Sequence, residues 1–236
     1  MARPADRRDM LSRFIEAKHP DGRPLSFNEV LTESQTVVGA GSDTTGISLR
    51  AILYYIITNP EVYAKLMDEI NTFAKGGLMS NPVTFAESLK MPYFCACVKE
   101  ALRIHSAVGY VLPRHVPKEG RTIAGRFFPE GSKAGVHAWT VHRDESVFGK
   151  DTDKFRPERW LESPEQAKNM DRYNLAFGHG PRICVGKNIS LMEMQKLIPT
   201  LFRRFNFELV DAKKPWKLHC SWFVHQEDMD CYVRTN

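Results

Sequence analysis

The chain has 236 residues, 42% of them hydrophobic and 11% aromatic, which is enough for one substantial buried core or two small ones. The net charge of +5 is modest, and Lys and Arg are spread along the chain. This pattern favours a solvated surface over a docking face for an acidic protein or an anionic membrane. It also excludes the basic stripe of a nucleic-acid-binding protein.

The five cysteines are irregularly spaced and include no CxxC pair. They therefore predict neither a disulfide framework nor a structural zinc site, and they suit a reducing compartment. No segment has the ~20 uninterrupted apolar residues of a membrane span, and the basic N-terminus lacks the apolar core of a signal peptide. As written, the chain is predicted to be soluble or peripheral.

The first part of the chain is predicted to be helical. An amphipathic spacing predicts a helix over residues 6–18. Ser26 and Glu29 form a capping box that starts a second helix, which runs to residue 59 and is apolar on nearly every face from Val37. Its length of about 33 residues is well beyond the usual globular length, so we expect it to be buried. Further helices are predicted over residues 60–73 and 91–105.

The second part of the chain mixes structural types. Short β-like runs separated by Pro and Gly occupy residues 108–136. Residues 143–180 show little periodicity, and an irregular stretch of this length is typical of a segment that wraps a cofactor. A helix is predicted over residues 186–205 and a hairpin over residues 207–233. The whole pattern predicts a mainly α fold with small β-sheets.

The strongest chemical signal is the stretch from Phe177 to Gly186, FGHGPRICVG. Its first two glycines permit a tight turn, so that backbone amides can approach a sulfur atom closely. Cys184 lies just before a predicted helix, whose positive N-terminal end favours a thiolate over a thiol. Arg182 adds a cation that can pair with a carboxylate. The alternative is a buried cysteine in a glycine-rich turn.

This stretch matches F-x-x-G-x-R-x-C-x-G throughout and thereby resembles the haem-binding signature of the cytochromes P450. The resemblance implies that Cys184 is the axial thiolate ligand of a haem b iron and that Arg182 and Gly186 contact the cofactor. It also implies that Phe177 packs beside the sulfur, keeps water away and tunes the redox potential. We rate no histidine as a ligand, and we expect His179 to point to solvent.

A second motif, AGSDTT at residues 40–45, is similar to the oxygen-activation motif in the long central helix of that family. Ala40 and Gly41 leave room for a flat cofactor and O2. Thr44 can hydrogen-bond a carbonyl of the preceding turn and open the helix locally, and Asp43 supplies a carboxylate for proton relay. The alternative, a glycine kink with surface polar residues, fits poorly with the apolar flanks.

Two further motifs imply a structural network. Glu100 and Arg103 share a helix face and resemble the family's E-x-x-R pair, which alone would be an ordinary exposed ion pair. The segment FRPERW at residues 155–160 resembles its P-E-R-F segment, whose arginine is Arg159 here. The resemblance implies that these three side chains fix the irregular segment over the proximal face. Arg114, with His115 as the alternative, is the candidate for a haem propionate.

The resemblance extends from about residue 6 to the end of the chain and implies a truncated cytochrome P450 fold. Its parts are the long central helix, the E-x-x-R helix, an irregular meander, the cysteine loop and the following helix. Residues 1–236 are expected to form a single domain, the C-terminal part of a P450 domain, with the N-terminal half absent. The phrase HAWTVHRD at residues 137–144 is similar to filamentous-fungal members of the pisatin-demethylase-like group.

The implied function is that of a haem-thiolate monooxygenase, which uses O2 and electrons from NADPH, delivered by a separate cytochrome reductase, to oxidise a small apolar organic substrate. The family usually lies at the cytosolic face of the endoplasmic reticulum. Ile47, residues 108–111 and residues 222–223 would shape the substrate pocket. The alternative is a catalytically incompetent haem-binding fragment or a partial gene product, and we expect the isolated chain to aggregate or to bind haem loosely. Four motifs in family order make a scaffold unrelated to haem improbable.

Overall fold

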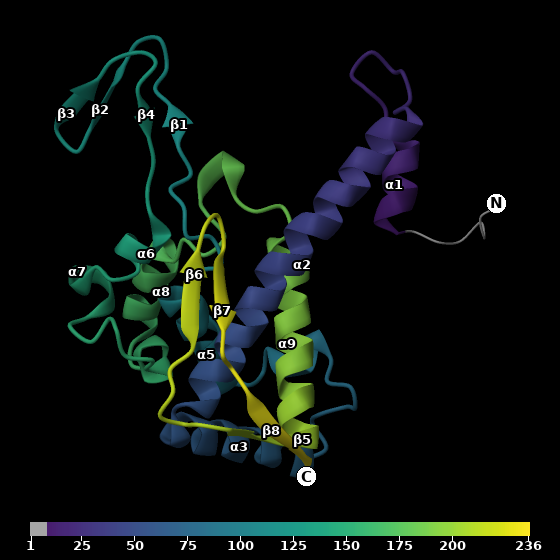
Figure 1. The fold of residues 1–236 in the computed structure, drawn as a ribbon, viewed down its shortest axis with the longest axis vertical. Coiled ribbons are helices and arrows are strands. Elements are labelled where there is room, and N and C mark those ends of the chain that lie inside the picture. The colour runs from purple at the N-terminus through teal and green to yellow at the C-terminus, as the bar shows by residue number, and fades with distance from the viewer. Residues whose placement is uncertain (1–8) are drawn as a thin grey trace. The chain divides into compact units, whose positions relative to one another are not determined.

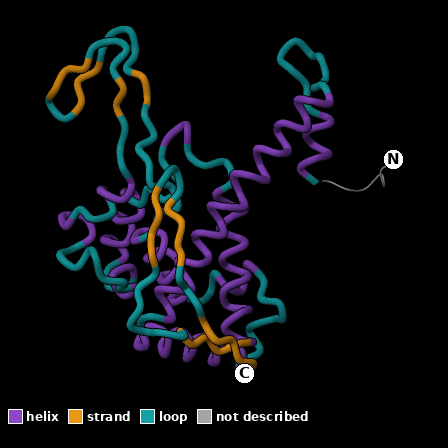
Figure 2. The backbone as a smooth tube through the Cα atoms, in the orientation of Figure 1, coloured by secondary structure: helices purple, strands orange, loops and turns teal. Residues whose placement is uncertain are grey.

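The computed structural model describes residues 9–236 and is mainly helical with small antiparallel sheets (Figures 1 and 2), which confirms the predicted fold class. The helices are α1 (Met10–Glu16), α2 (Phe27–Ile57), α3 (Pro60–Lys75), α4 (Phe85–Ser88), α5 (Pro92–Ile104), α6 (Ala138–Val141), α7 (Glu145–Phe148), α8 (Pro164–Tyr173) and α9 (Lys187–Arg204), with 3-10 helices η1 (Pro157–Trp160) and η2 (Gly180–Arg182). The strands are β1 (Arg114–His115), β2 (Arg121–Ile123), β3 (Arg126–Phe128), β4 (Lys133–Ala134), β5 (Phe205–Leu209), β6 (Lys217–Cys220), β7 (Val224–Glu227) and β8 (Cys231–Thr235).

The described chain divides into two compact units whose boundary lies inside α2, between Asp43 and Thr44. In the first unit, residues 6–8 of the first predicted helix lie outside the described residues, and α1 begins after Asp9, whose side chain accepts a hydrogen bond from the Ser12 amide at 2.8 Å. The predicted capping box at the start of α2 is confirmed. The amide of Ser26 donates to Glu29 Oε2 at 2.7 Å, and the amide of Glu29 donates to Ser26 Oγ at 3.3 Å.

Helix α2 differs from the prediction in two ways. Val30 is buried near the start of the helix, but no residue from 31 to 44 is, and Val38 is 70% exposed. Burial resumes at Thr45, and Ile47, Ile52 and Ile56 are fully buried. The predicted burial from Val37 onward was therefore too extensive. The helix is also α-helical without interruption through residues 40–45, so the expected local opening at the AGSDTT motif is absent.

The core of the second unit lies where the end of α2 meets α3, α5 and α9. Helix α3 contributes a stripe at i, i+4 and i+8, because Val62, Leu66 and Ile70 share one face. Phe94 of α5 and Phe202 of α9 fill the space opposite, and both are fully buried. The apolar periodicity of these helices therefore decides their packing.

The strands form four antiparallel pairs: β1 with β4, β2 with β3, β5 with β8 and β6 with β7. The prediction of a single hairpin over residues 207–233 was wrong in detail. Strands β6 and β7 form a tight inner hairpin, and β5 and β8 pair separately outside it, with Leu209 opposite Cys231. Two independent ladders have the same period-2 signature in sequence as one long ladder.

The meander also contains more regular structure than predicted. Helix α8 spans ten residues within the stretch that was expected to be irregular. Ser163 caps it by accepting a hydrogen bond from the Gln166 amide at 3.3 Å, and Pro164 occupies its first turn. This helix is strongly polar, and with so few apolar residues its helical period could not be recognised in the sequence.

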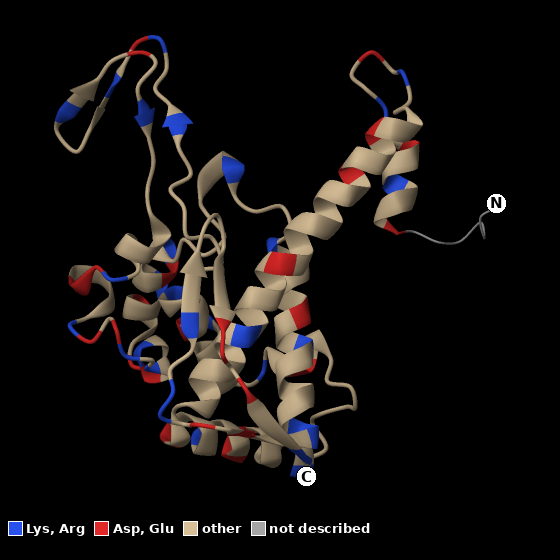
Figure 3. Ribbon diagram, in the orientation of Figure 1, with Lys and Arg blue, Asp and Glu red and all other residues tan. Residues whose placement is uncertain are grey.

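The surface charge is mixed. Figure 3 shows Lys and Arg interleaved with Asp and Glu along α3 and α8. Within residues 9–236, no helix combines the length and the apolar character that crossing a bilayer requires.

Candidate functional site

The Cys184 loop leads directly into α9. Gly178 and Gly180 both adopt positive φ, at 73° and 71°, which turns the chain sharply on either side of His179. The amide of Cys184 donates to the carbonyl of Phe177 at 2.9 Å and closes the loop. Gly186 then caps α9, and a Cβ built on it would lie 3.8 Å from Cys184 Sγ. The backbone around the sulfur is thus fixed by local geometry.

The same loop presents a thiol and apolar side chains to the outside. Cys184 is a free, exposed cysteine, Val185 is 99% exposed and Ile183 is 44% exposed. Arg182 is exposed and makes no ion pair or side-chain hydrogen bond with any described residue. An accessible sulfur, apolar neighbours and an unpaired cation fit a flat apolar cofactor with carboxylates, so this loop fits a haem, the group that the resemblance implies.

Phe177 is half-buried and belongs to the edge of the main core. The ammonium of Lys187 lies over its ring, 5.9 Å from the centroid. His179, in contrast, is exposed. The ring of Phe177 therefore anchors the base of the loop to the core, whereas the tip of the loop projects outward.

The structure brings Glu100, Arg103 and Arg159 together in a fully buried cluster. Arg103 donates to both carboxylate oxygens of Glu100, at 2.8 and 2.9 Å, and Arg159 Nε donates to Glu100 Oε1 at 2.9 Å. Arg103 also donates to the carbonyl of His142 at 2.8 Å. Arg159 donates to the carbonyl of Phe148. The cluster thus joins α5 to η1 and holds the intervening chain.

Two members of this cluster were missed in the sequence. The indole Nε1 of Trp160 donates to Glu100 Oε2 at 2.8 Å, and Asp151 accepts from Arg159 Nη1 at 2.9 Å. Asp151 supplies a second negative charge. Burial raises the pKa of its carboxyl, but the neighbouring Arg159 and Arg156 guanidiniums together outweigh this effect and hold the pKa below its usual value. Arg103 and Arg159 are thus balanced by Glu100 and Asp151, and Arg156, which also contacts Asp151, is paired with Glu162. Only the FRPERW context could have pointed to Trp160.

The AGSDTT motif contributes to both units. Ala40, Gly41 and Asp43 are exposed on α2 in the first unit, and Thr44, at the start of the second, is half-buried. The next residue, Thr45, is buried and shares a hydrogen bond of 3.0 Å with Ser190 Oγ of α9. This bond connects α2 to the helix that follows the cysteine loop, and sequence reasoning had not singled it out.

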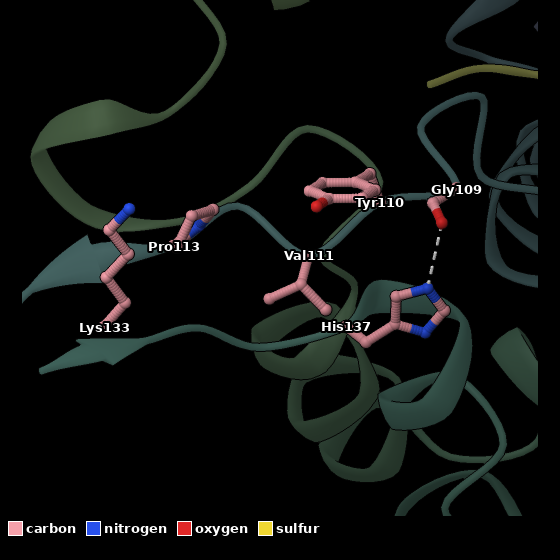
Figure 4. Close-up of a pocket in the computed structure, with 6 residues that line it drawn as sticks. All are labelled: Gly109, Tyr110, Val111, Pro113, Lys133 and His137. Carbon is pink, nitrogen blue, oxygen red and sulfur yellow. Dashed lines mark hydrogen bonds between the residues drawn. The ribbon is translucent and has the colours of Figure 1, made fainter. Parts of the chain in front are cut away.

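Arg114 is exposed in β1, and its Nη1 donates to the carbonyls of Leu112 and Pro113 at 3.1 and 3.0 Å. Neither a hydrogen bond nor an ion pair joins it to the cysteine loop within residues 9–236. His115 pairs in register with Lys133 of β4. Beside these strands lies a pocket of about 520 Å³. It is lined by Gly109, Tyr110, Val111, Pro113, Lys133 and His137 (Figure 4).

Part of the segment expected to shape a substrate pocket lines this cavity. Figure 4 shows His137 at one end, where its Nε2 lies 3.2 Å from the carbonyl of Gly109, and Lys133 beside Pro113 at the other. The ring of Tyr110 stacks on Trp222, with centroids 5.3 Å apart. The backbone of residues 107–109 is bonded to the β6–β7 turn, because the amide of Gly109 donates to the carbonyl of Trp222 at 3.1 Å. Residues 108–111 and 222–223 therefore form one surface.

Comparison with known proteins gives the family. The cytochrome P450 family model matches residues 1–229. The cytochrome P450 monooxygenase cicH of Emericella nidulans is 43% identical over 217 residues, which are 92% of this chain and 44% of that protein. The pisatin demethylase of Fusarium vanettenii is 46% identical over 190 residues, 80% of this chain and 36% of that protein. The monooxygenase gsfF of Penicillium aethiopicum is 39% identical over 231 residues, 97% of this chain and 45% of that protein.

These relatives are filamentous-fungal cytochromes P450 and include a pisatin demethylase, which confirms the resemblance noted in the sequence. The chain spans less than half the length of each of the three. The match over residues 1–229 and the identities of 39% to 46% lead to one conclusion. The chain belongs to the cytochrome P450 family.

Proposed function

We propose that this chain carries the haem-thiolate part of a monooxygenase and that Cys184 is the thiolate ligand of a haem b iron. The observation that carries the proposal is the cysteine loop. Its backbone is closed by the Cys184-to-Phe177 hydrogen bond of 2.9 Å, its sulfur is free and exposed, and its apolar neighbour Val185 is 99% exposed. Bound haem would supply the iron at which O2 is reduced and a C–H bond of an organic substrate is oxidised.

The residues of this chain would hold that group and control protons around it. Arg182, which has no partner among the described residues, and Arg114 would each bind a propionate carboxylate. Phe177 would keep water from the sulfur, as its place at the edge of the core allows. Asp43 and Thr44 would hold and relay protons, and Ala40, Gly41 and Gly186 would leave room for the flat cofactor.

The roles of Glu100, Arg103 and Arg159 would be structural only. Their side chains are fully buried, and they hydrogen-bond to one another and to the backbone of the meander. NADPH would supply the electrons through a separate cytochrome reductase, and the protein would lie at the cytosolic face of the endoplasmic reticulum. The substrate would be a small apolar organic molecule, in contact with Ile47 and the surface formed by residues 108–111 and 222–223.

A matched pair of cysteine variants tests the ligand. Cys184 and Cys220 are both free and exposed, but only Cys184 lies in the loop. Haem is added to the wild-type chain, to Cys184→Ser and to Cys220→Ser, and the CO difference spectrum of the reduced protein is recorded. Haem is kept in excess because the isolated chain is expected to bind it loosely. The haem that is bound should give a thiolate-type Soret band in the wild type and in Cys220→Ser but not in Cys184→Ser. An unchanged band in Cys184→Ser would overturn the assignment.

Turnover is measured separately with NADPH, a fungal reductase and a panel of apolar substrates. Product formation supports the monooxygenase. A chain that binds haem through Cys184 but forms no product would instead favour the catalytically incompetent fragment.

A further inference from the structure

The imidazole of His142 is a buried connection between two parts of the site. His142 follows α6, is fully buried, and lies edge-on to the ring of Phe148 at 6.0 Å between centroids. On one side it contacts the C-terminal end of α5. On the other it contacts the segment that enters the cysteine loop. Its ring has three hydrogen-bond partners, Arg103, Ser106 and Leu175, and all are more than 30 residues away in the chain, so spacing in the sequence could not identify it.

The partners of this imidazole fix its protonation. The amide of Leu175 can only donate, and it points at Nε2 from 2.7 Å. The carbonyl of Arg103 can only accept, and it lies 2.8 Å from Nδ1. Ser106 Oγ lies 3.2 Å from the same nitrogen and donates its own proton to the carbonyl of Leu102, so it also accepts from Nδ1. The ring must therefore be neutral, with its proton on Nδ1. Burial lowers the pKa of His142 to about 4, and the charges of Arg103 and Arg143 act in the same direction, so the ring stays neutral near pH 7.

On the α5 side, His142 is bound to the buried cluster twice. Its ring donates to the carbonyl of Arg103, one of the last carbonyls of α5 and therefore one without a partner inside the helix. Its own carbonyl accepts from Arg103 Nη1 at 2.8 Å. Because Arg103 is in turn held by Glu100, the position of the imidazole is set by that cluster.

On the loop side, the bond to Leu175 is the first of three in series. The carbonyl of Leu175 accepts from the amide of Gly178 at 2.9 Å, which holds the first turn of the loop. The carbonyl of Phe177, inside that turn, accepts from the amide of Cys184 at 2.9 Å. A shift of Leu175 is therefore passed through the turn to the backbone that carries the sulfur.

We propose that His142 is a positioning residue, whose Nε2 lone pair holds the base of the cysteine loop in register with the buried Glu100–Arg103–Arg159 cluster. This link acts on the loop whether or not a cofactor is bound. Only its consequence for the haem ligand rests on the proposed function.

Two substitutions separate the two ends of the link. In His142→Asn the side-chain amide can still donate to the carbonyl of Arg103, but it does not reach Leu175. In His142→Gln a carbonyl oxygen can reach the Leu175 amide in place of Nε2. His105→Asn is the matched control: His105 is also fully buried at the end of α5, and burial also lowers its pKa to about 4, but its ring contacts the carbonyl of Val224 in β7 and not the loop.

Hydrogen exchange of the amides in residues 175–186 is measured in the full chain without haem. Loss of the acceptor of the half-buried Leu175 amide should speed exchange at Leu175, Gly178 and Cys184 at least about tenfold in His142→Asn. His142→Gln should stay within about threefold of the wild type, and His105→Asn should leave the loop unchanged even if it lowers global stability. Loop exchange that is equally fast in His142→Asn and His105→Asn, or not restored by Gln, would overturn the proposal.

The haem-loaded proteins give a second readout. With CO, the thiolate-type Soret band should be weakened or shifted in His142→Asn and restored in His142→Gln. If the wild type shows no such band but the exchange pattern holds, the proposed function fails and the positioning role stands. If the wild-type band is present but neither the band nor the exchange responds to His142→Asn, the positioning role fails alone.

Discussion

Replacing Glu100 by Gln removes the negative charge at the centre of the buried cluster without changing its volume. In the native chain, the two carboxylate oxygens of Glu100 accept five hydrogen bonds, three from guanidinium nitrogens, one from the Trp160 indole and one from the amide of Arg156. In the variant, one of these oxygens becomes an NH2 group that faces donors. Arg103 and Arg159, both 0% exposed, lose the charge that lies between them.

The expected cost follows from burial. Removing one partner of a buried ion pair costs about 3–5 kcal/mol, because the remaining charge has no solvent to stabilise it. Asp151 still faces Arg159 at 2.9 Å and offsets part of the loss at that end, but no carboxylate contacts Arg103 after the substitution within the described chain. A loss of this size is a large part of a typical total stability of about 5–15 kcal/mol.

The assay is urea unfolding of the wild type and the variant, followed by far-ultraviolet circular dichroism and extrapolated to zero denaturant. Asp171→Asn is the control, since it breaks an ion pair to Lys99 of 2.7 Å whose side chains are 41% and 47% exposed. That change should cost only about 0.2–1 kcal/mol. If Glu100→Gln costs less than about 1 kcal/mol, or no more than the control, the argument from buried charge is refuted.

Two further outcomes are expected. Burial lowers the pKa of His105 and of His142 from 6.5 to about 4. Below about pH 6.5 these histidines therefore bind protons in the unfolded chain but not in the folded chain. The free energy of unfolding should fall by about 2 kcal/mol per histidine between pH 7.5 and pH 5. Urea unfolding at the two pH values measures this loss, which should be smaller by about one histidine's share in His142→Gln; a pH-independent stability would contradict it. Gly41→Ala should raise stability by about 0.5–1 kcal/mol, because a Cβ there meets no atom within 4 Å in the interior of α2. Thermal unfolding of both variants tests this, with Gly135→Ala as the comparison. The new Cβ in Gly135→Ala would lie 2.5 Å from Val111 Cγ1, so this substitution should destabilise the protein. A lower melting temperature for Gly41→Ala than for the wild type would contradict the prediction.

Features that depend on residues close together in the chain could be predicted from the sequence. Ser26 and Glu29 are three residues apart, and the capping box they predict is present. The helices predicted over residues 60–73, 91–105 and 186–205 match α3, α5 and α9 to within about two residues, as expected for helix ends. The turn chemistry of Gly178 and Gly180 likewise lies within the loop that they shape. These features can be predicted because the interactions that stabilise them join residues only a few positions apart.

Contacts between groups far apart in the chain depend on how the helices and strands pack, and the sequence did not predict them from spacing. Glu100 and Arg159 are 59 residues apart, and resemblance, not spacing, suggested their contact. The amide of Leu175 and the ring of His142 are 33 residues apart and carried no signal at all. The separate β5–β8 and β6–β7 ladders and the extent of burial along α2 were likewise settled by packing. A buried polar group takes whichever partner the folded chain brings within about 3 Å, and that partner depends on all the helices packed around it.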